Sequence, residues 1–374
     1  MIELSSRKSF KVTKWWYSLD HVTLFIVTFI MLFGLLVITS SSPSVAYKIG
    51  VDSNFFYKKH FIFLMVGFLT MLIISAFDDR LILKLSLPCF LFLLLLMFIV
   101  LLNEPQLKGA KRWIRVFGFS LQPSEFIKPV FIMINSLILS KYVIHKNASK
   151  FLLASFVLYV MTITLLILQP DMGMVINFTL IWLSQLFLIG FSFLIIFSIG
   201  LLGLIGLVFA YYYFPHVKYR IDMFLFSDGH MSYQVQKSID AIRNGGLWGQ
   251  GYFQGSVKDG LPDSHTDFVF SVIVEEFGFI VALCLIMAYA IVIIRVLTLA
   301  YKHENIFISL LLSGLALQIA FQVLVNIGVS INLLPTKGTI LPLVSYGGSS
   351  FIATSAMIGM ILLYSKSSYG RIIK

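Results

Sequence analysis

Charged residues and cysteines are scarce in this sequence of 374 residues. Only 12% of the residues are charged, whereas 59% are hydrophobic. A soluble domain needs a polar surface, so this composition excludes an ordinary soluble protein and indicates one that lies in a bilayer. The two cysteines, Cys89 and Cys284, both fall within apolar stretches and are expected to act as small hydrophobic residues, which excludes a disulfide framework.

The N-terminal residues also do not have the pattern expected of a cleavable secretion signal. Residues 1–20 are too polar and too basic to form the apolar core of a signal peptide, and no small-residue cleavage site follows the first apolar stretch, 22–40. We therefore expect this stretch to stay attached as the first membrane span. No linker of low complexity and no repeat divides the sequence. A single membrane domain over residues 1–374 is predicted, with 1–21 as its cytoplasmic N-terminal segment.

Long apolar runs are what the sequence has in abundance. A helix needs roughly 20 mostly apolar residues to cross a hydrocarbon core about 30 Å thick. The predicted fold class is an all-α integral membrane protein with about ten transmembrane helices. Little besides Gly190 separates the sixth span from the seventh, so nine or eleven spans stay open. The expected spans are 22–40, 60–77, 81–102, 124–143, 151–168, 172–189, 192–214, 267–296, 305–331 and 344–364.

The basic residues predict how the chain is oriented, because Lys and Arg favour the cytoplasmic side of a membrane. Those between Arg7 and Lys14 place the N-terminus in the cytoplasm, and those between Lys366 and Lys374 place the C-terminus there as well. The one long loop, 215–266, lies between the seventh and eighth spans and is then extracytoplasmic.

Basic residues also occur in loops that this orientation makes external. One interpretation is that the orientation is reversed or that these are ordinary solvated charges; the other is a surface that binds a phosphate-bearing substrate. The formal charge of +11 lies in short loops between apolar spans, which favours anionic lipid head groups or a lipid-linked substrate over nucleic acid as partners. The external basic residues are Lys108, Lys111, Arg112, Arg115, Lys218, Arg220, Lys237, Arg243 and Lys258.

Two groups of polar residues flank the fourth span, where ionisable side chains are costly and therefore candidates for function. Arg112 precedes Trp113, and a guanidinium can hold a phosphate through two hydrogen bonds while the indole lies at the membrane interface. Glu125 and Lys128 are three residues apart, so they share one face of a helix. They form either part of a binding site or a structural pair that anchors two helices.

Acidic residues mark the starts of two further spans. Asp171 follows Gln169 and Pro170, and capping of the sixth helix is its simpler interpretation. His265, Thr266 and Asp267 lead into the eighth span, where a carboxylate suits either catalysis or a plain helix cap. Helical spacing places Glu275 on the same face as Asp267, about two turns further along, and Glu276 on the opposite side.

The last group of polar residues opens the tenth span. Residues 334–338 read Leu-Pro-Thr-Lys-Gly, and residues 341–350 read Leu-Pro-Leu-Val-Ser-Tyr-Gly-Gly-Ser-Ser. Prolines and paired glycines at membrane depth indicate irregular backbone that lines a cavity or is buried in protein. Its amide groups and Lys337 are suited to bind an anion.

Together and in this order, the motifs resemble the SEDS family of bacterial shape, elongation, division and sporulation proteins. The resemblance covers the ten-span plan and nearly all of the second half of the chain. Within the family, 334–338 and 255–267 are similar to the division proteins, whereas Phe253-Gln254-Gly255 is similar to the elongation proteins. The matching residues are Lys108-Gly109, Arg112-Trp113, Gln122-Pro-Ser-Glu125, Lys128, Gln169-Pro-Asp171, Gly173, His265-Thr-Asp267, Glu275-Glu276 and Ser345-Tyr-Gly-Gly-Ser-Ser350.

The resemblance implies a peptidoglycan glycosyltransferase that polymerises lipid II on the outer face of the cytoplasmic (inner) membrane, at the division septum. It also implies a class B penicillin-binding transpeptidase and other division proteins as partners, and Asp267 as the essential catalytic acid. A carboxylate there is suited to be a general base, and Arg112, Lys128 and Lys337 to hold the lipid pyrophosphate, alone or with Mg²⁺ or Mn²⁺; no metal ligand is assigned. The other expected substrate contacts are Trp113, Glu125, Gln169, Asp171, His265, Thr266, Ser345, Gly347, Gly348 and Ser349.

Three alternatives remain at this stage: a lipid II flippase, an elongation polymerase, and a non-catalytic scaffold that recruits a transpeptidase. A transport path needs polar groups through the whole depth of the membrane. The polar groups singled out above gather at the outer ends of the fourth, eighth and tenth spans, which favours chemistry at the surface. A scaffold, unlike an enzyme, would tolerate Asp267→Asn.

Overall fold

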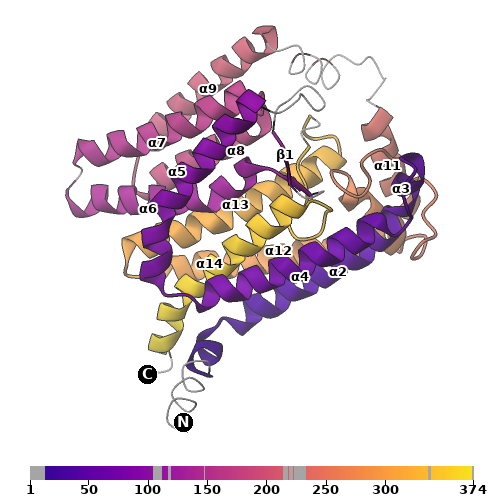
Figure 1. Cartoon of the computed structure of the whole chain (residues 1–374), viewed down its shortest axis with the longest axis horizontal. Coiled ribbons are helices and arrows are strands. Elements are labelled where there is room, and N and C mark those ends of the chain that lie inside the picture. Colours follow the sequence, from indigo (N-terminus) through magenta and orange to yellow (C-terminus); the bar gives the residue numbers. More distant parts are fainter. Residues whose placement is uncertain are drawn as a thin grey trace.

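The computed structural model describes residues 13–103, 112–116, 119–146, 148–213, 218, 222, 233–335 and 338–372. Its long helices lie side by side in a bundle (Figure 1). They are α2 (His21–Ser41), α4 (Phe55–Ala76), α5 (Asp79–Asn103), α6 (Pro123–Ile144), α7 (Ser149–Leu168), α8 (Met172–Leu188), α9 (Phe193–Tyr213), α12 (Val269–Tyr301), α13 (Ile306–Ser330) and α14 (Gly348–Ile372).

Every expected span coincides with one of these helices, which confirms the all-α membrane fold. Eight of them, within the described residues, are long and apolar enough to cross a membrane, and α8 is shorter at 17 residues. The exact number of crossings, the side on which each loop lies and the orientation stay predictions. Elements that were not foreseen are α3 (Pro43–Lys48), α11 (Tyr233–Gly245) and an antiparallel hairpin of β1 (Ile114–Val116) and β2 (Phe119–Leu121).

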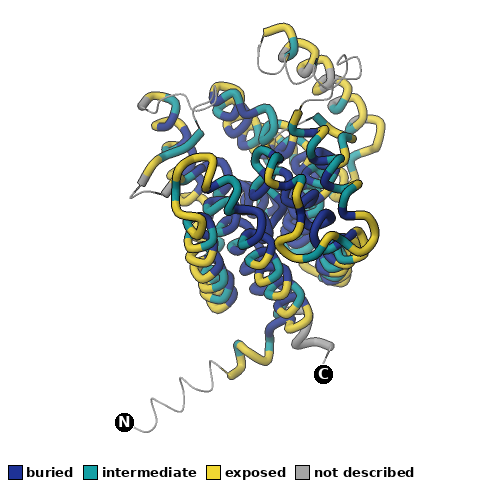
Figure 2. The backbone as a smooth tube through the Cα atoms, turned by 90° about the vertical axis from the view of Figure 1, so that its right-hand side faces the viewer, coloured by how far each residue is buried: buried dark blue, intermediate teal, exposed yellow. Residues whose placement is uncertain are grey.

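Small residues allow the helices to approach closely, as is common between helices in membranes. A Cβ atom on Gly67 of α4 would lie 2.6 Å from the Ser355 hydroxyl of α14. The side chain of Ser355 therefore packs directly against the backbone of α4. Around them, α12 packs on α13, and α6 packs on α5, α7 and α13. Buried positions fill the inside of the bundle, and exposed apolar positions face outwards (Figure 2).

Helix α12 is interrupted near its start, although the sequence predicted one continuous helix. Gly278 has φ 84° and ψ 165°, a conformation that favours glycine. The chain after α11 supplies the missing hydrogen bonds: Gly246 O accepts from Phe279 N at 3.0 Å, and Gly251 N donates to Glu276 O at 3.0 Å. The break is therefore satisfied within the protein, as irregular backbone at membrane depth must be.

Candidate functional site

Asp267 lies in a tight turn immediately before α12, half-buried. Asp263, which has φ 53°, accepts backbone hydrogen bonds at its carbonyl from Thr266 N at 3.0 Å and Asp267 N at 3.1 Å. The N-cap of α12 is Phe268, and no side chain caps this helix. Asp267 therefore precedes the N-cap residue, and the plain-cap interpretation of Asp267 is wrong.

Asn326 of α13 connects the backbone of Asp267 to the backbone of Thr339. Its Nδ2 donates to Asp267 O at 2.8 Å and to Thr339 O at 2.7 Å. Gly338 lies next to the acid, since a Cβ atom on this glycine would be 3.6 Å from Asp267 Oδ2. Asn326 was not predicted from the sequence, because an uncharged amide within an apolar span gives no signal comparable to that of an ionisable group.

Asn326→Asp tests whether this double hydrogen bond positions Asp267. The variant loses both donated hydrogen bonds and brings a second negative charge near the acid, so we expect kcat to fall by about tenfold to a hundredfold with KM little changed. Ser330→Ala, one turn along the same buried face, removes a hydroxyl that bonds within its own helix and is the matched control. A pH–rate profile and kcat equal to those of the parent protein would contradict the positioning role.

His265 and Tyr346 join this turn to the segment that opens α14. Tyr346 N donates to His265 O at 2.8 Å, and their rings lie 5.4 Å apart. Thr266, in contrast, turns its hydroxyl back to Asp263 O at 3.2 Å.

A second cluster surrounds Asp171, which is the N-cap of α8 as the simpler interpretation predicted. Its Oδ2 lies 3.5 Å from Nε of Arg112 and 3.4 Å from Nε2 of Gln122. Arg112 also donates to Pro170 O. The guanidinium is thus held in place, and its side chain remains 21% exposed.

Ser349, in the first turn of α14, connects the second cluster to the first. Its hydroxyl accepts from Gln122 N at 3.0 Å and donates to Ser120 O at 3.1 Å. Three residues earlier, Tyr346 bonds to the turn that carries Asp267. Residues 345–349, named here the bridging segment, therefore link the Arg112 cluster to the Asp267 turn.

The remaining members of the bridging segment shape its backbone. Ser345 Oγ accepts from Leu341 N at 2.8 Å. Gly347 and Gly348 lie against Ile340 and Phe63, where a Cβ atom would come within 2.6 Å and 2.5 Å of those side chains. Of the other expected site residues, Trp113 is half-buried beside β1, whereas Lys108, Lys111 and Lys337 lie outside the described residues.

Three of the expected substrate contacts, Glu125, Lys128 and Gln169, are used inside the protein. Lys128 Nζ lies 2.6 Å from Glu125 Oε2, and their side chains are 1% and 8% exposed. This arrangement fits the structural pair that the sequence left open. Gln169 is also buried and donates to Met97 O at 2.9 Å, which joins α5 to the start of α8.

The two adjacent acids of α12 hold the long loop rather than extend the site. Glu275 accepts from Val257 N and Lys258 N, each at 2.8 Å. Glu276 forms a buried ion pair with Lys258, whose Nζ also donates to Ser40 Oγ at 2.6 Å. Neither interpretation of the external basic residues holds for Lys258, which is 3% exposed and paired with Glu276.

Polar side chains also occur deep within the bundle. Asn135 donates to Gln185 at 2.8 Å, and Ser155 donates to Asn135 at 2.6 Å. Gln318 and Gln322 are buried on α13, and among the described residues Nε2 of the first and Oε1 of the second have no hydrogen-bond partner. Buried amides thus occur in addition to the polar groups that the sequence placed at the helix ends.

No group of three or more His, Cys, Asp or Glu side chains suited to hold a metal ion occurs within the described part of the chain. Mg²⁺ is commonly held by one or two carboxylates together with substrate phosphates, so a larger cluster is not required for it.

Comparison with known proteins gives the family. The family of FtsW, RodA and SpoVE, described as cell cycle protein, matches residues 20–370. The chain belongs to this family. A curated relative from Caulobacter vibrioides, named probable peptidoglycan glycosyltransferase FtsW, is 35% identical. The alignment covers 93% of this chain and 89% of the relative's chain. A relative from Haemophilus influenzae with the same name is 30% identical, and the alignment covers 92% of this chain and 89% of that relative's chain.

Solved structures agree with this assignment. A chain from a structure that describes how a peptidoglycan synthase complex coordinates polymerization and crosslinking has a TM-score of 0.78 and 27% identity, and covers 94% of this chain and 98% of its own. Rod shape determining protein RodA of Thermus thermophilus has a TM-score of 0.70 and 27% identity, and the match covers 95% of this chain and 99% of the RodA chain. The resemblance to the SEDS family, and within it to FtsW, is confirmed.

Proposed function

We propose that this chain is a peptidoglycan glycosyltransferase of the FtsW type, which polymerises lipid II into glycan strands during septal wall synthesis. The observation that carries the proposal is the half-buried carboxylate of Asp267, whose backbone is held by Asn326 and whose neighbour is a glycine, at the end of the bundle that also holds Arg112. The names of the curated relatives support the activity.

In the proposed reaction, Asp267 is the general base. It takes the proton from the sugar hydroxyl of one substrate molecule as that oxygen attacks the anomeric carbon of another. A new glycosidic C–O bond forms, the bond between the anomeric carbon and the pyrophosphate oxygen breaks, and the lipid pyrophosphate leaves with the electron pair. The absence of a side chain at Gly338 leaves room for the acceptor sugar beside the carboxylate.

Cationic groups stabilise the charge that grows on the leaving pyrophosphate. Arg112 is suited to this because Asp171 and Pro170 fix its position, while the remaining N–H groups of a guanidinium stay available. Lys337 is the second candidate, and Lys128 is assigned to hold Glu125 instead. Partners are proposed to be a class B penicillin-binding transpeptidase and other division proteins, at the septal inner membrane.

A second function, transport of lipid II across the membrane, is favoured by one observation: the buried amides of Asn135, Gln185, Gln318 and Gln322 within the bundle. Polymerisation and transport differ in their need for a membrane. Purified protein with its transpeptidase partner and lipid II in detergent is expected to produce glycan polymer, detectable by gel electrophoresis. Lack of polymer in detergent, together with lipid II transfer across vesicles, would support the transporter instead.

A further inference from the structure

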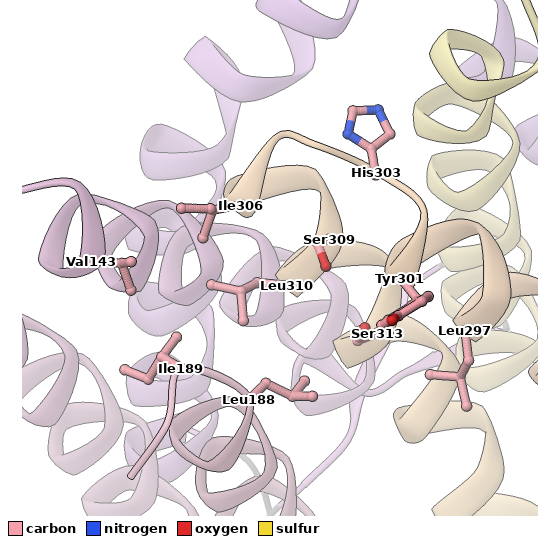
Figure 3. Close-up of a pocket in the computed structure, with 10 residues that line it drawn as sticks. All are labelled: Val143, Leu188, Ile189, Leu297, Tyr301, His303, Ile306, Ser309, Leu310 and Ser313. Carbon is pink, nitrogen blue, oxygen red and sulfur yellow. The ribbon is translucent and has the colours of Figure 1, made fainter. Parts of the chain in front are cut away.

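A pocket of about 480 Å³ lies at the far end of α12 from Asp267. The ends of α6, α8 and α12 and the start of α13 enclose it (Figure 3). This volume lies within the range of small-molecule sites, roughly 300 to 1,000 Å³. Six of its ten lining side chains are aliphatic, namely Val143, Leu188, Ile189, Leu297, Ile306 and Leu310.

The other lining residues give the pocket a polar side. They are Tyr301, His303, Ser309 and Ser313. Tyr301 is the last residue of α12 and is 90% exposed, and an exposed tyrosine at the end of a membrane helix marks the level of the lipid head groups. The pocket is therefore apolar where hydrocarbon chains lie and polar at the head-group level, which suits an amphiphile.

Basic residues follow two of the lining residues, Tyr301 and Val143, closely in the chain. Exposed Lys302 and half-buried His303 directly follow Tyr301, with Glu304 as the acid of that loop. The chain that continues from Val143 carries Lys146 and Lys150 and has no acid before residue 171. Arg295, one turn and a half before Tyr301, is already bound to Asp20 at 2.7 Å. The charge of the rim favours an anionic head group over a zwitterionic one.

We propose that this pocket binds an anionic phospholipid, with one acyl chain between the aliphatic side chains and the phosphate beside Lys302 and His303. A partner helix is a poorer occupant, because a helix about 10 Å across needs a groove along several turns. This pocket instead uses the last turns of α6, α8 and α12 and the first two turns of α13. The site is independent of the polymerisation chemistry.

Native mass spectrometry of the full chain in detergent tests the proposal, with phosphatidylglycerol or phosphatidylethanolamine added at equal concentration. We expect phosphatidylglycerol to be retained several-fold more strongly. Lys302→Gln should lower its affinity by about fivefold, the loss for one basic residue beside an anionic head group. Ser313→Trp should fill the pocket and remove the bound lipid. The controls are Thr298→Trp, on the exposed face of α12, and Lys84→Gln, an exposed lysine of α5.

Three outcomes would overturn this site. The first is equal retention of the two lipids by the parent protein. The second is that neither Ser313→Trp nor Lys302→Gln changes the retention of phosphatidylglycerol, or that the two control variants lower this retention as much as these two variants do. The third is a dimer of this chain that Ser313→Trp dissociates, which would identify a second copy as the occupant. Circular dichroism shows whether each variant is folded before lipid is added.

Discussion

Asp267→Asn is expected to abolish glycan polymerisation by the purified protein while its fold stays intact. The amide cannot accept the proton of the attacking hydroxyl, and removal of a general base costs about 10²- to 10⁴-fold in rate. The substitution keeps the shape of the side chain. Asn326 donates to the backbone carbonyl of Asp267, and the backbone amide of Asp267 donates to Asp263 O, so neither hydrogen bond uses the carboxylate. Measurement is by gel electrophoresis of glycan formed from lipid II in detergent.

Asp259→Asn is the matched control for this prediction. Asp259 is an exposed acid of the same loop, eight residues before Asp267, and its backbone carbonyl accepts from Lys48. Polymerisation should remain at the parent rate in this variant. If Asp267→Asn polymerises lipid II as fast as Asp259→Asn does, Asp267 is not the base, and a scaffold or another catalytic group must be considered.

Lys258→Met is expected to lower the free energy of unfolding by about 3–5 kcal/mol, because it leaves a buried carboxylate without its partner. Glu276 is 0% exposed at its side chain and depends on Lys258 and Ser40 for compensation. The double variant Lys258→Met with Glu276→Gln removes both charges and should recover part of the loss. The denaturant midpoint of the protein in detergent, followed by tryptophan fluorescence, measures both effects.

Lys237→Met provides the comparison for Lys258→Met. Lys237 belongs to α11 in the same loop, is half-buried and lies 5.9 Å above the ring of Tyr233. Its replacement should change the unfolding free energy by about 1 kcal/mol or less, the magnitude of a partly exposed cation–π contact. A midpoint for Lys258→Met equal to that of Lys237→Met would mean that the buried pair contributes nothing to stability.

The membrane helices were predictable from sequence because each depends on local composition. An apolar run such as 305–331 has no stable state in a bilayer except a helix, and α13 (Ile306–Ser330) begins and ends within one residue of that range. The break at Gly278 was not predictable, since it depends on the backbone after α11, about thirty residues earlier, filling the gap. Tertiary hydrogen bonds of this kind leave no periodic signal in the sequence.

The residue types of the site could be predicted from the sequence, but most of the partners that these residues contact could not. Asp171 as a helix cap and Glu125 with Lys128 as a pair follow from spacing along one helix, and both arrangements are present. In contrast, Arg112 binds Asp171 and Lys258 binds Glu276 across different elements, and many other pairings of these charges were equally compatible with the sequence. The choice among them is made by packing, which composition does not encode.

The bridging segment sets a fixed distance scale for any ligand that reaches both clusters. It contacts the Asp267 turn through Tyr346 and the Arg112 cluster through Ser349, only three residues apart in the chain. The proposed general base and the Arg112 guanidinium are thus both tied to the same short stretch of backbone. We expect their spacing to favour ligands with a matching length between the reacting carbon and the phosphate.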